Sequence, residues 1–198
     1  MDDIVLRGMA RWPNVPSVYG WLSLDRRGQW LLKGDRVRNP GIIEFFGRNY
    51  GHDDSGRWFV QNGPQRVFVK LDYTPLVYRL GTGTDIQAHT GNPAGTVTQA
   101  YLDEQGHVLL ETAQGIGLVH DADLDTVITA LRGADGKALD DAALDAALCQ
   151  LQSGVPAALT LATGGAAVPV NPIASADVPL RFGFNPCPLQ PAGEEECY

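Results

Sequence analysis

In the stretch Leu22-Ser23-Leu24-Asp25-Arg26-Arg27-Gly28-Gln29-Trp30-Leu31-Leu32, an Asp, two polar residues and a Gly separate two apolar runs. The same order returns at His52-Asp53-Asp54-Ser55-Gly56-Arg57-Trp58-Phe59-Val60 and at Leu102-Asp103-Glu104-Gln105-Gly106-His107-Val108-Leu109-Leu110. The Asp carboxylate can accept a backbone N–H two residues later, and the Gly can adopt the positive φ that closes a hairpin with a bulge. Three hairpins of one design predict a sheet-rich protein. The copies lie 28 and 50 residues apart, which excludes a solenoid or propeller period.

The composition is that of a globular protein outside the membrane. The hydrophobic fraction is 44%, and no apolar run approaches the roughly 20 residues that a membrane helix needs. Asp2 and Asp3 stand where a signal peptide would be basic, so we predict a cytoplasmic location. Three cysteines (Cys149, Cys187 and Cys197) without metal-type spacing fit a reducing compartment. Met9 offers a second start, which would place the first eight residues outside the fold.

Charge divides the chain into two unlike halves. Residues 1–80 carry twelve of the fifteen Lys and Arg and twelve of the sixteen aromatic residues, whereas residues 81–198 carry fifteen of the twenty-three acids. We therefore predict a basic, aromatic, hairpin-rich subdomain over 1–80 and an acidic α+β subdomain over 81–198, with a loose tail from about 186. The expected boundary is Gly81-Thr82-Gly83-Thr84.

Three short helices are expected. Asn39-Pro40 is a cap and first-turn pair for a helix that ends at Gly51, apolar residues at helical spacing follow Asp121 up to Gly133, and a third helix runs from the cap Asp140 to Gly154. Within the second of these, residues 126–129 would also suit a strand. Pro169 is expected to confine its strand to a sheet edge.

The predicted fold class is α+β, with antiparallel hairpins dominating, about three short helices, and two packed subdomains. The helices are expected to cover one face of the sheet or the join between the halves.

Two histidine and aspartate groups are candidate metal ligands. They are His52-Asp53-Asp54 and His120-Asp121-Ala122-Asp123. The aspartates of the first group are expected to form a hairpin turn and those of the second a helix cap, so both sets already have a role in holding the backbone. Gly81-Thr82-Gly83 and Gly115-Ile116-Gly117 lack the further residues of a phosphate loop. Cys149 lies near a helix stripe and is interpreted as an inert buried thiol. We predict no metal and no cofactor, and the catalytic residues, if any exist, are not recognisable.

Asn62-Gly63 is the strongest hairpin signal in the sequence, and side-chain amides and an arginine lie on both sides of it. Such groups on a rigid turn can recognise a carboxylate, a phosphate or a base edge, with aromatic rings nearby for stacking. The alternative is the ordinary solvated end of a hairpin. The predicted ligand-binding residues are Gln61, Asn62, Gln65, Arg66, Trp58 and Phe68.

Three stretches resemble an uncharacterised proteobacterial family of proteins of unknown function. They are the run from Gly20 to Trp30, the run from Arg57 to Val69, and Val178-Pro179-Leu180-Arg181-Phe182-Gly183-Phe184. The resemblance covers nearly the whole chain. It implies a bacterial origin and transfers no activity and no site residues.

The leading functional hypothesis is a cytoplasmic, non-catalytic binding or protein-interaction module with a small-molecule or protein partner, compatible with a homodimer and without a membrane role. One alternative is a small enzyme with a site in the cleft between the halves. Another is binding of single-stranded nucleic acid by the N-terminal half. The intact chain is not expected to bind nucleic acid, because the acidic half repels the same polyanion.

Overall fold

The computed structural model describes residues 1–11, 15, 17–81, 85–163 and 166–191. The chain forms two compact units. Unit 1 comprises Met1–Pro75, His89–Gly91 and Gly183–Tyr198, and unit 2 comprises Leu76–Ala88 and Asn92–Phe182. Unit 1 therefore takes in two segments from the second half of the sequence. The predicted boundary at Gly81-Thr82-Gly83-Thr84 lies outside the described residues except for Gly81.

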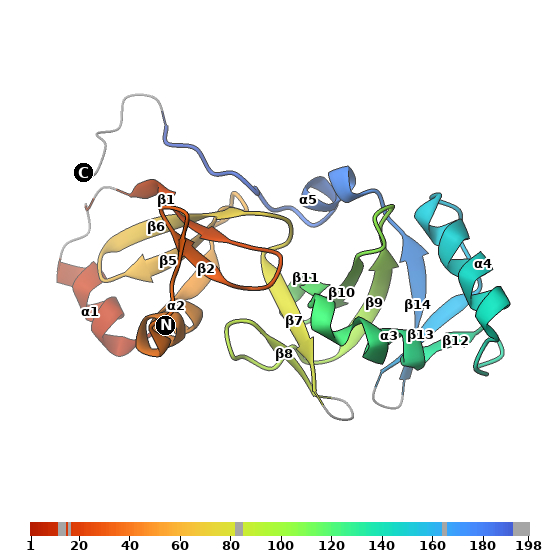
Figure 1. Cartoon of the computed structure of the whole chain (residues 1–198). Helices are drawn as coiled ribbons and strands as arrows, with labels where there is room; N and C mark the ends of the chain where they lie inside the picture. Colours follow the sequence, from red (N-terminus) through yellow and green to blue (C-terminus); the bar gives the residue numbers. More distant parts are fainter. Residues whose placement is uncertain (12–14, 16, 82–84, 164–165, 192–198) are drawn as a thin grey trace. The chain divides into compact units, whose positions relative to one another are not determined.

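Unit 1 contains two helices and a six-stranded sheet (Figure 1). Its elements are α1 (Asp3–Arg11), β1 (Val18–Leu24), β2 (Trp30–Leu32), β3 (Asp35–Arg36), α2 (Pro40–Arg48), β4 (Tyr50–His52), β5 (Trp58–Asn62) and β6 (Gln65–Leu71). The strand order is β3-β2-β1-β6-β5-β4. Neighbours along the chain pair antiparallel, but β1 and β6 pair in parallel at the centre.

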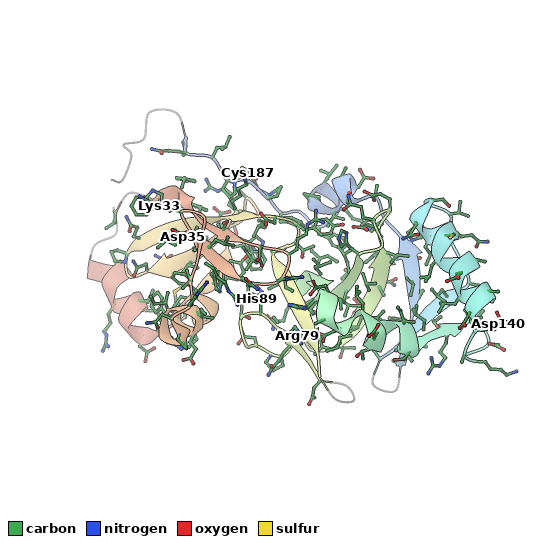
Figure 2. All side chains as sticks on the ribbon, viewed as in Figure 1. Lys33, Asp35, Arg79, His89, Asp140 and Cys187 are labelled. Carbon is green, nitrogen blue, oxygen red and sulfur yellow. The ribbon has the colours of Figure 1, made fainter. Side chains whose placement is uncertain are left out.

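The core of unit 1 lies on one face of this sheet, around Trp30, which is 1% exposed. Its indole meets the ring of Phe46 on α2 at 5.5 Å and the ring of Tyr50 on β4 at 5.1 Å, both edge to face. His89, labelled in Figure 2, belongs to the 89–91 segment. Its ring packs against Trp30, with 5.3 Å between the ring centroids. A Cβ on Gly47 would lie 2.6 Å from the carbonyl oxygen of Thr90, so a glycine is needed where α2 meets this segment.

The three predicted turns are confirmed and share one geometry. In each, the first Asp accepts the N–H groups two and four residues later through Oδ1, at 2.8–3.0 Å. Gly28, Gly56 and Gly106 adopt φ of 72°, 70° and 84°. The two later turns add a side-chain bond, from Arg57 to Asp53 in one and between His107 and Asp103 in the other.

Residues 1–8, which a start at Met9 would leave out, are part of the fold. They belong largely to α1, on which Val5 is 2% exposed. The backbone N–H of Asp2 donates to Oδ1 of Asn49 at 2.9 Å, and Nε of Arg48 lies 3.1 Å from a carboxylate oxygen of Asp2. The N-terminal residues are thus fastened to the end of α2.

The described part of unit 2 contains an eight-stranded sheet, three α-helices and two short 3-10 helices, labelled η (Figure 1). Its elements are β7 (Leu76–Leu80), β8 (Ile86–Ala88), β9 (Val97–Leu102), β10 (Val108–Thr112), β11 (Gly115–Val119), η1 (Asp121–Asp123), α3 (Leu124–Ala130), β12 (Leu131–Gly133), α4 (Asp141–Gln152), β13 (Leu159–Thr163), β14 (Ala166–Pro172), η2 (Ser175–Asp177) and α5 (Val178–Arg181). The strand order is β12-β13-β14-β9-β10-β11-β7-β8, with parallel pairs at β14·β9 and β11·β7.

Two local predictions for unit 2 are corrected. The helix expected to run to Gly133 ends at Ala130, because residues 131–133 pair with β13 as a strand. Pro169 does not mark an edge, since β14 lies between β13 and β9. Its missing N–H is tolerated because the parallel ladder with β9 begins one residue later, at Val170.

The C-terminal segment belongs to unit 1. The backbone N–H of Leu71 donates to the carbonyl of Pro186 at 2.8 Å, and Asn185 N–H donates to the carbonyl of Gly56 at 2.9 Å. A Cβ on Gly56 would lie 2.1 Å from the carbonyl oxygen of Gly183. These two hydrogen bonds and the close packing of Gly56 on Gly183 hold residues 183–186 in place. The tail expected to be loose starts at the end of this segment.

The protein is therefore a strand-dominated α+β fold with two mixed sheets. The predicted helices at α2, α3 and α4 are present, with side-chain caps from Asn39 and Asp140 on the first and the last. The expectation of about three helices in a fold dominated by antiparallel hairpins is too simple. It missed α1 and α5 and the parallel pairs that join distant strands.

Candidate functional site

The six residues predicted to bind ligand lie on two strands, β5 and β6, and the sheet register divides them between two faces. Gln61 pairs with Arg66 and Asn62 pairs with Gln65. Because successive residues of a strand point to opposite faces, Phe68 shares one face with Gln61 and Arg66, and Trp58 points to the other with Asn62 and Gln65. The six do not form a single cluster.

Gln61 is a structural side chain. It is 1% exposed, and its Nε2 donates to the carbonyl of Gly63 at 2.9 Å, which braces the hairpin. Its Oε1 is buried and has no hydrogen-bond partner among the described residues. The amide is therefore closed off from a ligand in solution.

Trp58 and Phe68 are each held by neighbouring rings. Trp58 contacts Tyr50 at 4.7 Å and His52 at 4.9 Å between centroids. Phe68 is stacked on Tyr19 at 4.6 Å and meets Phe59 edge to face at 5.7 Å. Arg66 lies 4.7 Å from the ring centroid of Phe59.

The two candidate groups of histidine and aspartate side chains have structural partners. Asp53 holds its turn and forms an ion pair with Arg57 at 2.7 Å. His120 accepts the N–H of Ala122 through Nδ1, and Asp123 binds the guanidinium of Arg79. The described part of the chain contains no group of three or more His, Cys, Asp or Glu side chains that could hold an ion.

Cys149 is exposed, so the interpretation of a buried thiol is wrong. The residue lies on the outer side of α4, whose buried residue is Leu151. Cys187 is also exposed and free, and Cys197 lies outside the described residues. No helix in the described ranges has the length and the apolar character needed to cross a membrane.

A cavity of about 570 Å³ opens in unit 2, where sequence reasoning placed no site. Three chain segments line it: the start of β8, the residues that lead into β9, and the turn end of the β13–β14 hairpin. Its lining residues are Asp85, Ile86, Gln87, Pro93, Gly95, Thr96, Val97, Thr163 and Ala166. Because β8 ends the strand order on one side and β13 lies next to the other end, a cavity lined by both shows that the sheet curls into a half-barrel.

A narrower recess of about 70 Å³ shares part of this lining, including Asp85, Ile86 and Thr163. Its other walls are mainly apolar and come from β7, β10, β13 and the face of α3 that carries Val127. They are Leu80, Gly81, Leu110, Thr126, Val127, Ala130, Leu161 and Ala162. The lining of the wide cavity thus includes several polar side chains, whereas the lining of the recess is mainly aliphatic.

The sequence carries little signal for this cavity. Its residues are small, and they come from positions 85–97 and 163–166 without a motif. Only the pairing of β14 with β9, whose partners Val170 and Ala100 lie 70 positions apart, brings the two segments near one another. Nothing local in the sequence encodes that pairing.

The fold and the cavity define a two-unit α+β protein with mixed sheets, one of them a half-barrel around a small-molecule-sized cavity. The chain belongs to the family described as "Protein of unknown function (DUF2946)", which matches residues 1–189. No curated protein matches the chain.

The chain is similar to two solved structures. A DUF1285 family protein from Silicibacter pomeroyi DSS-3 has a TM-score of 0.52 and 15% identity over 81% of this chain and 85% of that one. A DUF1285 family protein from Shewanella baltica OS155 has a TM-score of 0.44 and 16% identity over 55% of this chain and 91% of that one. The first similarity supports the fold, and neither indicates a specific function.

Proposed function

We propose that the protein is a non-catalytic binding module that takes a small polar ligand into the half-barrel cavity of unit 2. The observation that carries the proposal is the volume of about 570 Å³, which lies within the range of about 300–1,000 Å³ of small-molecule sites. Such sites commonly open at the mouths of curled or closed sheets.

The lining favours a ligand that donates hydrogen bonds. Asp85 contributes a carboxylate, Gln87 an amide, and Thr96 and Thr163 hydroxyl groups. The described lining includes no Lys, Arg or His. Unit 2 as a whole carries four Lys and Arg against twelve Asp and Glu, so its field attracts cations. A small organic amine fits both features.

The apolar recess narrows the ligand class further. A short alkyl group of the ligand would contact Leu110, Val127 and Leu161 there, while its ammonium group stays near Asp85. Each buried methylene would contribute about 0.8 kcal/mol. The favoured ligand is therefore an alkylamine or a diamine rather than a sugar or a phosphate ester.

Thermal unfolding of the full chain with n-butylamine, putrescine and spermidine at 5 mM tests the proposal. A ligand with a dissociation constant near 0.5 mM would stabilise the folded state by about 1.4 kcal/mol and raise Tm by about 3 °C. Ala166→Phe should fill the exposed cavity and abolish the shift, and Asp85→Asn should reduce it.

Matched controls separate the cavity from general charge effects. Ala146→Phe, on the exposed side of α4, and Asp125→Asn, an exposed carboxylate on α3, should leave the shift unchanged. The proposal is wrong if none of the three amines raises Tm, or if Ala166→Phe binds them as the unaltered chain does.

We also infer that the protein works in the cytoplasm of a proteobacterium. The exposed, free Cys149 and Cys187 suit a reducing compartment. The bacterial sources of the two similar structures support the origin. Fractionation of a native host with an antibody to the protein would test the location, and recovery in the periplasmic fraction would contradict it.

A further inference from the structure

One face of the six-stranded sheet of unit 1 carries cationic and aromatic side chains in rows. This face is the one opposite the Trp30 core, and we call it the cationic–aromatic face. It consists of Tyr19, Trp21, Lys33, Arg36, Phe59, Arg66, Phe68 and Lys70.

The strand register defines the first row. Arg36 pairs with Leu31, Leu31 with Ser23, and Ser23 with Lys70, so the four side chains cross β3, β2, β1 and β6 on the same side. Three strand spacings of about 4.8 Å separate its two cations, or roughly 14 Å. Both cationic side chains are exposed.

The second row is aromatic. Phe59 and Phe68 are direct cross-strand partners, and Tyr19 stacks on Phe68 with an interplanar angle of 12°. In β1 the backbone bulges at Gly20, where φ is 73°, and Trp21 follows on the same face as Tyr19. Nζ of Lys33, which lies at the β2–β3 turn (Figure 2), is 3.7 Å from the Trp21 ring centroid.

A third row begins with Arg66, the cross-strand partner of Gln61. Its guanidinium lies over the Phe59 ring at 4.7 Å. Cations therefore border the aromatic row on both sides. Tyr19, Trp21 and Arg66 are partly exposed. Phe59 is buried beneath Arg66, and Phe68 is buried beneath Tyr19 and Arg57, so these two rings form the floor.

We propose that the cationic–aromatic face binds single-stranded nucleic acid. Partly exposed rings at Tyr19 and Trp21 offer stacking surfaces for two bases, and the bordering cations Lys33, Arg66 and Lys70 lie where a backbone would pass. An acidic peptide would use the cations but not the rings, whereas a nucleic acid strand uses both. This inference is independent of the amine site in unit 2.

The net charge of −8 opposes the binding only at long range. Charges separated by more than the Debye length, about 8–10 Å at physiological ionic strength, are largely screened. Local complementarity over the face then decides the affinity. Net charge alone leads to the opposite expectation, that the intact chain binds no nucleic acid. The binding experiment described next decides between the two.

Fluorescence anisotropy of the full chain with 5′-fluorescein-labelled dT20 and rU20 tests the proposal. About three phosphate contacts predict a slope of log Kd against log salt near 2, so binding weakens about 16-fold between 50 and 200 mM NaCl. The expected Kd is in the low micromolar range at 50 mM NaCl. A blunt 20-base-pair duplex should bind several-fold more weakly, because its bases cannot stack on Tyr19 and Trp21.

Three variants distinguish this face from general charge. Trp21→Leu should weaken dT20 binding about tenfold with little change in the salt slope, since base stacking is lost. Lys70→Ala, at an exposed position where the fold is not at risk, should weaken binding and lower the salt slope by about 0.7. Arg38→Ala removes an equal, exposed charge from the loop before α2 and should change Kd less than twofold.

The proposal is overturned by any of three results: no binding of dT20 or rU20 at 50 mM NaCl with 100 μM protein, equal losses for Lys70→Ala and Arg38→Ala, or duplex binding as tight as that of dT20. Circular dichroism of Trp21→Leu at each salt concentration verifies that the variant is folded. If it is unfolded, Tyr19→Leu and Lys70→Ala decide.

Discussion

The carboxylate of Asp123 accepts two hydrogen bonds from the guanidinium of Arg79, at 2.7 and 3.1 Å, across 44 residues of sequence. It also accepts the backbone N–H of Leu80 at 3.0 Å. Burial raises the pKa of Asp123, but these bonds outweigh burial, so the pKa lies below its ordinary value. The pair joins β7 to the entrance of α3.

Asp123→Ala should therefore destabilise the protein by about 2–3 kcal/mol, because it leaves a part-buried N–H and a guanidinium without their acceptor. Arg79→Ala should cost less, since the Arg79 side chain is 54% exposed. Urea unfolding at pH 7 measures both. Because the folded-state pKa of Asp123 is lowered, its contribution is present above the unfolded pKa near 4 and is lost as the pH falls further. Equal losses for the two variants would contradict this assignment.

His89 should make the protein sensitive to mild acid. Burial lowers the pKa of His89 to about 3, against about 6.5 in an unfolded chain. The free energy of unfolding is therefore highest above pH 6.5, where the imidazole is neutral in both states, and it falls as the pH decreases toward 3. About 2 kcal/mol is lost between pH 7 and pH 5. His89→Phe should flatten the pH dependence of urea unfolding over that interval. An unchanged slope in His89→Phe would show that another group titrates.

Gly56 and Gly106, which close two of the shared turns, should not tolerate substitution equally. Gly56→Ala should cost more than 3 kcal/mol, because the new Cβ would strike the carbonyl of Gly183, in addition to the strain of a positive φ. Gly106→Ala should cost about 1–2 kcal/mol, because its nearest obstacle is the flexible end of Gln152 at 3.0 Å. Gly136→Ala, where φ is 77° and no atom lies within 4 Å, gives the cost of strain alone. Chemical denaturation of the three variants should reproduce this order.

The first helix should be part of the cooperative unit. Val5→Asp buries a charge at a position that is 2% exposed and should destabilise the protein by about 3 kcal/mol. Leu6→Asp, one residue later and 49% exposed, should be nearly neutral. Equal unfolding midpoints for the two variants would mean that α1 is not packed in solution.

Local chemistry explains what the sequence could predict. The Asp-x-x-Gly turns and the Asn39 and Asp140 caps depend on side chains that reach backbone groups only two to four residues away. Such geometry can be derived without the rest of the chain. The strands on either side of each turn follow from alternation in the same way.

The parts that could not be predicted depend on distant residues. Ser23 pairs with Lys70, and Val170 with Ala100, through parallel ladders that no short motif specifies. Asp2 stands directly before α1 and Asp3 lies in its first turn, both favourable at a helix N-terminus, but the packing of α1 becomes evident only from the bond to Asn49. Parallel pairing always requires a long connection, and the sequence of that connection does not identify the partner strand.

The candidate site shows the same limit. Gln61, Asn62, Gln65 and Arg66 are close in sequence, and their side-chain chemistry suggested one cluster. Alternation along β5 and β6 sends them to opposite faces, which period-2 reasoning applied to the predicted hairpin would have revealed. The cavity of unit 2, in contrast, could not have been found without the strand order.

The attachment of residues 183–186 to Gly56 and Leu71 bears on how the nascent chain matures. Most of unit 1 is synthesised before unit 2, yet it receives backbone bonds from residues 183–186, which follow unit 2 in the sequence. The carbonyl of Gly56 and the N–H of Leu71 therefore lack these partners until the whole of unit 2 has been synthesised. A truncated product that stops before residue 183 would leave both backbone groups without these bonds.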